Sequence, residues 1–360
     1  MLHDIFTGLG LIGLLWAIAY VFVLARRNFR AKAGIDAAAY GLVPRAELDA
    51  TRAGPVPAAD EALGRAVAAA WRGEWEPAAD LLAVSGEQEQ RWDRLQELAH
   101  TAVDDERWLR TWRAVRPQDA DAVAVQAQAL LYRAWRARGS EYANRTSDEQ
   151  AAAFHELLGA ARYTAEEAAR MAPRDPAPWI TLVTAARGLN LSREEFQWMW
   201  GELIARAPYH YEAHWQALQF WCQKWHGSHK LMFGFADEAV EKAPAGSPLA
   251  AMYVYALYEM WLQSGDQAAY RAAGVKPRLR KVLASLEQVP AADPRLPRIR
   301  HLLAAALVKS GLNDAALEQF RLIGGWCGAA PWTDAKDPAA EFDRWRGMAA
   351  LSARKARRAR

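Results

Sequence analysis

Apolar and polar positions alternate along residues 61–345 with the period of α-helices, and no stretch alternates with the two-residue period of a strand. One stripe has apolar residues at i, i+3, i+4 and i+7, which places them on one helix face: Phe196, Met199, Trp200 and Leu203. Ser192 and Glu195 precede this stripe with the spacing of a capping box, and Ser147 with Gln150 repeats the arrangement. The pattern predicts an all-α domain.

Prolines recur between the predicted helices, and two successive intervals between them are nearly equal. Pro117, Pro173, Pro208, Pro244 and Pro290 are separated by 56, 35, 36 and 46 residues. Proline cannot continue a helix but fits the first turn of the next one. Two successive intervals of this length are typical of stacked helix–turn–helix units, with insertions lengthening the outer ones. We therefore expect an α-solenoid of helix pairs over residues 61–345.

Residues 301–323 resemble a tetratricopeptide repeat. Gly311 stands at the inter-helix turn, Ala316 at the close crossing of the two helices, and Phe320 at the packing aromatic position. A second unit, residues 62–82, has matching offsets at Gly73, Ala78 and Leu82. The segment WCQKWHGSH, residues 221–229, is similar to an uncharacterised family of membrane-anchored actinobacterial proteins, which implies no activity. The resemblance implies tetratricopeptide-like helix pairs that bind protein partners.

The N-terminal region contains an uninterrupted apolar run. Residues 5–25 carry no charge and would span roughly 31 Å as a helix, close to the thickness of a bilayer core. Four basic residues follow within 26–32, which predicts a cytoplasmic C-terminal side. We expect a single-pass plasma-membrane protein with residues 1–4 outside, a transmembrane helix at 5–25, and a basic juxtamembrane segment and linker at 26–60.

A cleavable signal peptide is the alternative interpretation of this run. Residues 31–33, Ala-Lys-Ala, match the small-residue pattern of a cleavage site. Signal peptides, however, carry their basic residues before a shorter apolar stretch. The alternative would make the protein an exported helical-repeat domain.

Composition and charge exclude several classes of protein. The 360 residues are 52% hydrophobic with only two cysteines, which argues against disorder and a disulfide framework. Both ends are basic, whereas residues 33–350 carry a net charge of about −5. We expect no nucleic-acid partner, because such proteins usually distribute basic residues over a folded face. The tail 346–360 is basic enough to contact anionic lipid, although inert solubilising charge explains it equally well.

Four histidines gather in a short segment: His210, His214, His226 and His229. His210 and His214 share a helix face at the i, i+4 spacing of metal ligands. One helix over 210–225 would separate its ends by roughly 22 Å, so the four cannot meet at one ion. They are weak metal candidates, and buried, hydrogen-bonded histidines are the simpler expectation. Cys222 and His226 form an i, i+4 thiol and base between tryptophans, where a thiol is usually inert.

The chain contains 17 tryptophans, more than five or six small helix pairs obviously require. Stacked helix pairs expose a concave groove in which tryptophan can anchor a partner, although packing accounts for most tryptophans. The resemblance to peptide-binding repeats implies four inward-facing residues: Gln216, Phe220, Gln223 and Lys224. We expect a non-catalytic, membrane-anchored scaffold or adaptor that binds a protein or peptide and needs no cofactor. The alternative is a metal-dependent or thiol enzyme built on His210–His229.

Overall fold

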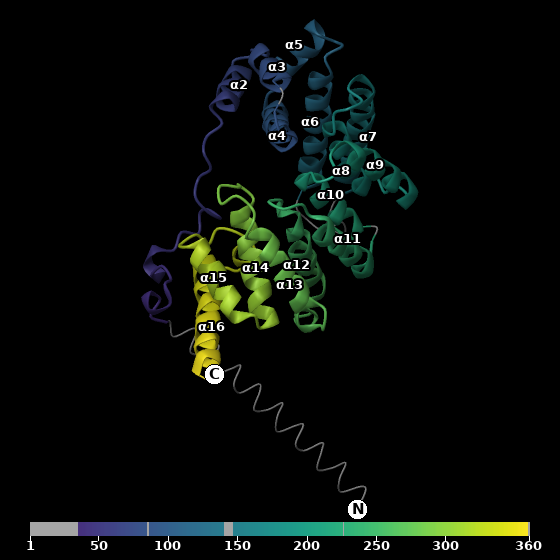
Figure 1. The fold of residues 1–360 in the computed structure, drawn as a ribbon. Helices are drawn as coiled ribbons and strands as arrows, with labels where there is room; N and C mark the ends of the chain where they lie inside the picture. The colour runs from purple at the N-terminus through teal and green to yellow at the C-terminus, as the bar shows by residue number, and fades with distance from the viewer. Residues whose placement is uncertain (1–34, 85, 140–146, 226, 359–360) are drawn as a thin grey trace, which may run out of the picture. The chain divides into compact units, whose positions relative to one another are not determined.

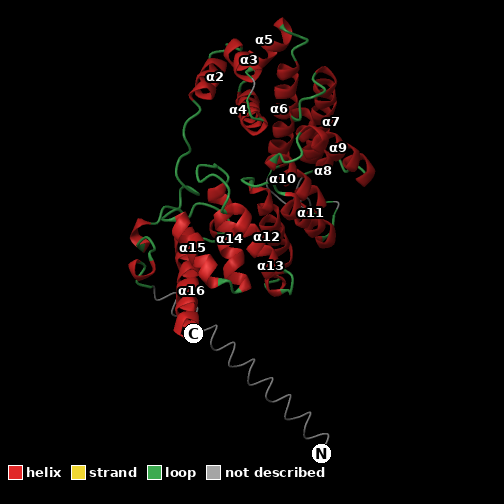
Figure 2. Ribbon diagram, viewed as in Figure 1, coloured by secondary structure: helices red, strands yellow, loops and turns green. Residues whose placement is uncertain are grey.

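The computed structural model describes residues 35–84, 86–139, 147–225 and 227–358. Within these ranges the chain forms fifteen α-helices and five short 3-10 helices (Figure 2). The predicted all-α class is confirmed, and the succession of helices is compatible with a helical repeat. The chain divides into two compact units, with Ala58–Met252 in unit 2 and Met1–Pro57 together with Tyr253–Arg360 in unit 1. The division falls inside the range 61–345 that was expected to form one domain.

Unit 2 is a succession of helical hairpins (Figure 1). Its helices are α2 (Glu61–Trp71), α3 (Glu76–Ala83), α4 (Gln88–Asp104), α5 (Arg107–Val115), α6 (Ala120–Arg138), α7 (Asp148–Met171), α8 (Ala177–Gly188), α9 (Arg193–Arg206), α10 (Tyr211–Trp221) and α11 (His229–Lys242), followed by the 3-10 helix η4 (Pro248–Ala251). The first helices of successive hairpins pack on one another in the order α2, α4, α6, α8 and α10. We call α4, α6, α8 and α10 the inner helices.

Local chemistry sets the helix boundaries in unit 2. The capping boxes predicted at Ser147 and Ser192 both form, so α7 and α9 begin where the sequence indicates. Pro117, Pro173, Pro208, Pro244 and Pro290 all lie between helices, as expected from the inability of proline to continue a helix. Ser228 accepts a hydrogen bond from the Leu231 amide and caps α11.

A partly buried ion-pair cluster joins the start of α4 to the starts of two other inner helices. Arg91 Nη2 lies within hydrogen-bonding distance of Asp121 at the start of α6 and of Asp175 just before α8. Arg91 Nη1 also donates to the Leu82 carbonyl in the last turn of α3. One guanidinium therefore ties four segments together, as its planar fork of donors allows.

Unit 1 has a helical part that follows unit 2 in the chain. It comprises α12 (Met252–Ser264), which starts at the boundary, η5 (Ala268–Arg271), α13 (Val275–Leu286), α14 (Leu296–Ser310), α15 (Asn313–Ile323), η6 (Trp332–Asp334) and α16 (Pro338–Arg358). α14 packs against α13, α15 and α16. The α14–α15 turn contains Gly311 in the left-handed region with φ of 82°, and Ala316 and Phe320 are buried, as the repeat-like pattern predicted.

Residues 35–57 pack onto this helical part of unit 1. They form η1 (Ala38–Tyr40) and η2 (Arg45–Glu47), in a segment that was expected to be a linker. The Asp49 amide donates to the Gly325 carbonyl at 2.9 Å, and the Cys327 amide donates to the Asp49 carbonyl at 2.7 Å. Arg346 Nη1 donates to the Val43 carbonyl at 2.6 Å. Backbone pairing and a buried arginine thus join this segment to the end of the chain.

The predicted fold must be corrected in one respect. No helix within residues 35–84, 86–139, 147–225 and 227–358 is both long enough and apolar enough to cross a bilayer. The fold class with an N-terminal transmembrane helix is therefore not the one observed. Residues 5–25, on which that helix was predicted, lie outside the described residues. The prediction rested on the length of the uncharged run and on the basic residues that follow it, and both register composition rather than packing.

Candidate functional site

Side-chain hydrogen bonds connect the inner helices of unit 2 to one another. Tyr132 Oη on α6 donates to Gln96 Oε1 on α4 at 2.9 Å. Thr181 Oγ1 on α8 donates to Gln128 Oε1 on α6 at 2.8 Å. Arg187 Nη1 on α8 donates to Gln216 Oε1 on α10 at 2.8 Å. Each interface between neighbouring inner helices is therefore bridged by a polar pair, and we call these six residues the polar strip.

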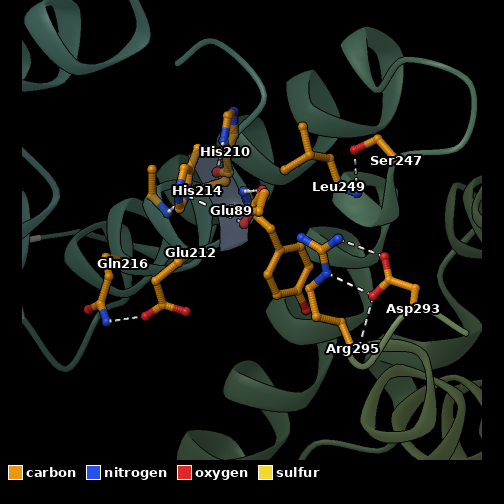
Figure 3. A network of polar contacts seen from close by, with 11 residues as sticks. Glu89, His210, Glu212, His214, Gln216, Ser247, Leu249, Asp293 and Arg295 are labelled. Carbon is orange, nitrogen blue, oxygen red and sulfur yellow. Dashed lines mark hydrogen bonds and ion pairs between the residues drawn. The ribbon is translucent and has the colours of Figure 1, made fainter. Parts of the chain in front are cut away.

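The first and last inner helices are also linked. Glu89 Oε1 on α4 accepts a 2.7 Å hydrogen bond from the Tyr211 amide at the start of α10 (Figure 3). Glu89 Oε2 lies 3.8 Å from His210 Nδ1. Glu89 therefore stabilises the N-terminus of α10, where an anion interacts favourably with the unpaired amides. The contact links the start of α4 to the start of α10.

Glu212 extends the polar strip on α10. Its side chain accepts a 2.7 Å hydrogen bond from Gln216 Nε2, as Figure 3 shows. Burial raises the pKa of the Glu212 carboxyl, and the Gln216 hydrogen bond and the Arg187 charge partly oppose this. Gln216 thus bridges a carboxyl and a guanidinium through its two amide ends. The Gln216 amide could instead form hydrogen bonds with the backbone of a bound peptide, because a side-chain amide and a peptide bond each offer a donor group and an acceptor.

The structure places His210 and His214 in the interior of unit 2. His210 is the N-cap of α10, and its Nδ1 accepts from the Ala213 amide at 3.4 Å. His214 Nδ1 lies 2.9 Å from the His210 carbonyl, and its ring meets the edge of Trp200 at 5.0 Å. Burial lowers the pKa of His214 to about 4, so the ring is neutral near physiological pH. Helix capping and packing account for both side chains.

The remaining candidates of the enzyme alternative are not brought together. His229 is the first residue of α11, and His226 lies outside the described residues. Across the described part of the chain, no group of three His, Cys, Asp or Glu side chains is placed to hold a metal ion. Cys222 is fully buried, and its Sγ lies 3.4 Å from both the Leu218 carbonyl and Met232 Sδ. A substrate therefore has no access to this thiol in the observed fold.

The four residues expected to face a partner differ in their surroundings. Phe220 is fully buried and stacks on Phe196 at 3.7 Å between ring centroids, so it belongs to the core. The resemblance to peptide-binding repeats, which implied that Phe220 faces a partner, did not distinguish the two faces of α10, because apolar residues occur on both. Gln216 is half-buried in the polar strip, and Gln223 and Lys224 are exposed after α10.

An aromatic and cationic cluster lies at the C-terminal ends of α6 and α8. The Trp225 ring meets Trp135 edge-on at 5.8 Å, and Phe154 meets Trp135 at 5.0 Å. The Arg187 guanidinium carbon lies 4.7 Å from the Trp135 centroid, and that of Arg138 lies 5.5 Å from the Trp225 centroid. We call these five residues the Trp–Arg cluster. Arg187 belongs to both the cluster and the polar strip, so the two are continuous.

A tight turn after α10 positions Trp225 in this cluster. The Cys222 carbonyl accepts from the amides of Trp225 at 3.0 Å and Gly227 at 3.2 Å. A Cβ atom at Gly227 would lie 1.7 Å from the Trp221 carbonyl oxygen, so only glycine fits this position. The motif WCQKWHGSH thus encodes a turn that directs a tryptophan towards two arginines.

Sequence reasoning singled out only Gln216 among the residues of the polar strip and the Trp–Arg cluster. Arg138 and Arg187 stand in the last turns of their helices, where basic residues are common for electrostatic reasons. Their convergence depends on how α6, α8 and the turn after α10 pack together, and no local pattern encodes that packing. The abundance of tryptophan was the available signal, although it did not identify positions.

No protein-family model, curated protein or solved structure matches the chain. Function must therefore be argued from the geometry of the chain itself.

Proposed function

We propose that the chain is a non-catalytic helical-repeat adaptor that binds an extended segment of a partner protein along the inner helices of unit 2. The proposal follows the tetratricopeptide-like pattern of the sequence. It rests on one observation, the polar strip that crosses the inner helices and continues into the Trp–Arg cluster.

The chemistry of the polar strip suits a peptide. Glutamine and tyrosine side chains offer both donors and acceptors and glutamate offers acceptors, so together they can match the groups of a peptide backbone. Gln96, Tyr132, Glu212 and Gln216 are only partly buried, so their unused hydrogen-bonding positions remain within reach of a ligand. Such a group lies on α4, α6 and α10, and Arg187 supplies donors on α8, so an extended chain would meet a partly exposed polar side chain on each inner helix.

The Trp–Arg cluster supplies the apolar contact that the polar strip lacks. Trp135, Trp225 and Arg187 are partly buried, and tryptophan and arginine are the residue types that dominate binding energy at interfaces. Their mutual stacking fixes the rings before a partner arrives, which lowers the entropic cost of binding.

Site-specific photo-crosslinking of the full chain in cells tests this proposal. A benzoylphenylalanine replaces Gln216 on α10 or, as the matched control, Tyr163 on α7, which is 68% exposed. We expect a discrete protein to crosslink from position 216 and not from position 163. The captured protein, once purified, should bind the wild-type chain in a saturable manner and bind a Gln216→Ala variant about tenfold more weakly. The same products from both positions, or none from position 216, would contradict the proposal.

A further inference from the structure

An amine is enclosed by aromatic rings in unit 1. Lys309, in the last turn of α14, is only 8% exposed. Its Nζ lies 3.8 Å from the Trp261 ring centroid, 4.5 Å from that of Tyr270 and 5.6 Å from that of Trp345. The three rings come from α12, η5 and α16, and we call them the Lys309 cage.

The rings of the Lys309 cage are fixed in place by their own contacts. Tyr270 Oη donates to the Leu257 carbonyl at 3.0 Å. Trp345 Nε1 donates to Glu341 Oε1 at 2.6 Å. Trp261 stacks on Tyr258 at 5.9 Å. The cage is therefore preformed around the amine.

The Lys309 amine has no polar partner among the described residues. No hydrogen bond or ion pair reaches its Nζ from these residues, and only ring faces contact it closely. Cation–π attraction offsets only part of the cost of removing an ammonium ion from water.

Desolvation makes this amine a nucleophile near neutral pH. Burial lowers the pKa of Lys309 to about 8, although the negative charges of Asp334 and Glu341 act in the opposite direction. Roughly one tenth of the amine is then uncharged at pH 7, about 300-fold more than for an ordinary lysine. A desolvated lysine in an apolar pocket is the type of amine that forms imines with carbonyl compounds.

We propose that Lys309 is a covalent capture site for a small, neutral, apolar aldehyde. The amine lone pair attacks the carbonyl carbon, the nitrogen loses a proton, and the oxygen gains one from solvent. The resulting carbinolamine then loses water to give the imine. The step consumes an amine and an aldehyde and releases one water molecule, with no change in oxidation state. It is independent of the partner-binding function proposed for unit 2.

The surroundings of the cage select for the charge of the aldehyde. Asp334 is exposed and Glu341 half-buried, and both interact electrostatically with Lys309. They disfavour an aldehyde that carries a carboxylate or a phosphate, because like charges repel. The ring faces of Trp261 and Trp345 favour an apolar or aromatic substituent.

Reductive trapping on the folded full-length chain tests the proposal. The chain is incubated with benzaldehyde or with 4-carboxybenzaldehyde in the presence of cyanoborohydride, and modified lysines are mapped by mass spectrometry. We expect benzaldehyde to modify Lys309 about tenfold or more faster than the exposed Lys336 near pH 7. The rate at Lys309 should rise with a midpoint near pH 8, and 4-carboxybenzaldehyde should react more slowly there. Because Lys336 is an internal control, this comparison needs no variant.

Two variants add specificity. Lys309→Arg keeps the charge and should lose this adduct while Lys336 is still modified. Glu341→Gln keeps the hydrogen-bond acceptor for Trp345 but removes a negative charge. It should therefore reduce the difference between the rates at which benzaldehyde and 4-carboxybenzaldehyde modify Lys309. The proposal is overturned if Lys309 reacts no faster than Lys336, or if it reacts only after the chain is unfolded.

Discussion

Trp332 donates its indole N–H to Nδ1 of His301 at a distance of 2.8 Å. The opposite ring nitrogen, Nε2, lies 2.8 Å from the carbonyl oxygen of Ala53. Because Nδ1 accepts, the imidazole proton must be on Nε2, where it is donated to Ala53. One neutral histidine therefore links α14, η6 and the segment 35–57 of unit 1.

This arrangement predicts that unit 1 loses stability in mild acid. Burial lowers the pKa of His301 to about 4, whereas an unfolded histidine titrates near 6.5. Between these values the unfolded chain binds more protons, so the free energy of unfolding falls as the pH falls from about 6.5 to about 4. The loss from this group is about 3 kcal/mol. Urea unfolding at a series of pH values measures it.

His301→Gln is the matched variant for this measurement. A glutamine can donate to Ala53 and accept from Trp332, yet it does not titrate. We expect the variant to unfold with a shallower pH dependence over the same window. If the free energy of unfolding of His301→Gln varied with pH as steeply as that of the wild type, other groups such as His214 in unit 2 would account for the whole pH dependence.

The buried Lys309 amine predicts that the free energy of unfolding depends on pH in the alkaline range. Its pKa of about 8 in the folded chain lies below the value of about 10.5 expected after unfolding. The unfolded chain binds more protons between these values, so the wild-type chain should gain stability as the pH rises through this window. Lys309→Met should remove that gain and, near neutral pH, should stabilise the chain by about 1–2 kcal/mol. Thermal unfolding against a Lys336→Met control provides the comparison, and a destabilised Lys309→Met variant would refute this prediction.

The contacts of Arg91 with Asp121 and Asp175 predict that the stability changes caused by substituting these three residues are strongly non-additive. Arg91→Met leaves Asp121 and Asp175 without their shared partner and should destabilise the chain by about 3–5 kcal/mol. Adding Asp121→Asn and Asp175→Asn to the same chain should restore most of that loss, because no partly buried charge then remains unpaired. Chemical unfolding of the single, double and triple variants measures the coupling. Equal additive losses at every step would contradict a shared cluster.

The close packing around Gly227 predicts that a larger side chain at this position destabilises the turn that contains Trp225. Gly227→Ala would place a methyl group against the Trp221 carbonyl, so the turn must shift and the chain should lose about 2 kcal/mol or more. Gly159→Ala is the control, because it lies within α7 with open space around its Cβ position. That change should stabilise the chain by about 0.5–1 kcal/mol. Thermal unfolding distinguishes the two, and a neutral Gly227→Ala would show that the turn adapts.

Local interactions made the helices predictable from the sequence. The capping boxes at Ser147 and Ser192, the inter-helix prolines and the Gly311 turn all lie where the residue pattern placed them. Each depends on groups no more than a few residues apart, so the chemistry is visible along the chain. The apolar run at 5–25 contains no capping or turn motif of this kind. The described residues contain no membrane-spanning helix.

The candidate site was far less predictable. The resemblance to peptide-binding repeats implied that Phe220 and Gln216 both face a partner, although Phe220 is fully buried and Gln216 bonds to Arg187. Which face of a helix is covered depends on the neighbouring helices, and the sequence of α10 does not specify them.

The sequence by itself determined the all-α class and the boundaries of many helices, because periodicity and capping act within one or two turns. Only the tertiary structure decided which side chains meet. Lys309 lies among Trp261, Tyr270 and Trp345, and His301 binds a carbonyl 248 positions away. Contacts of this kind depend on the rotation and crossing of packed helices, which many residues fix jointly.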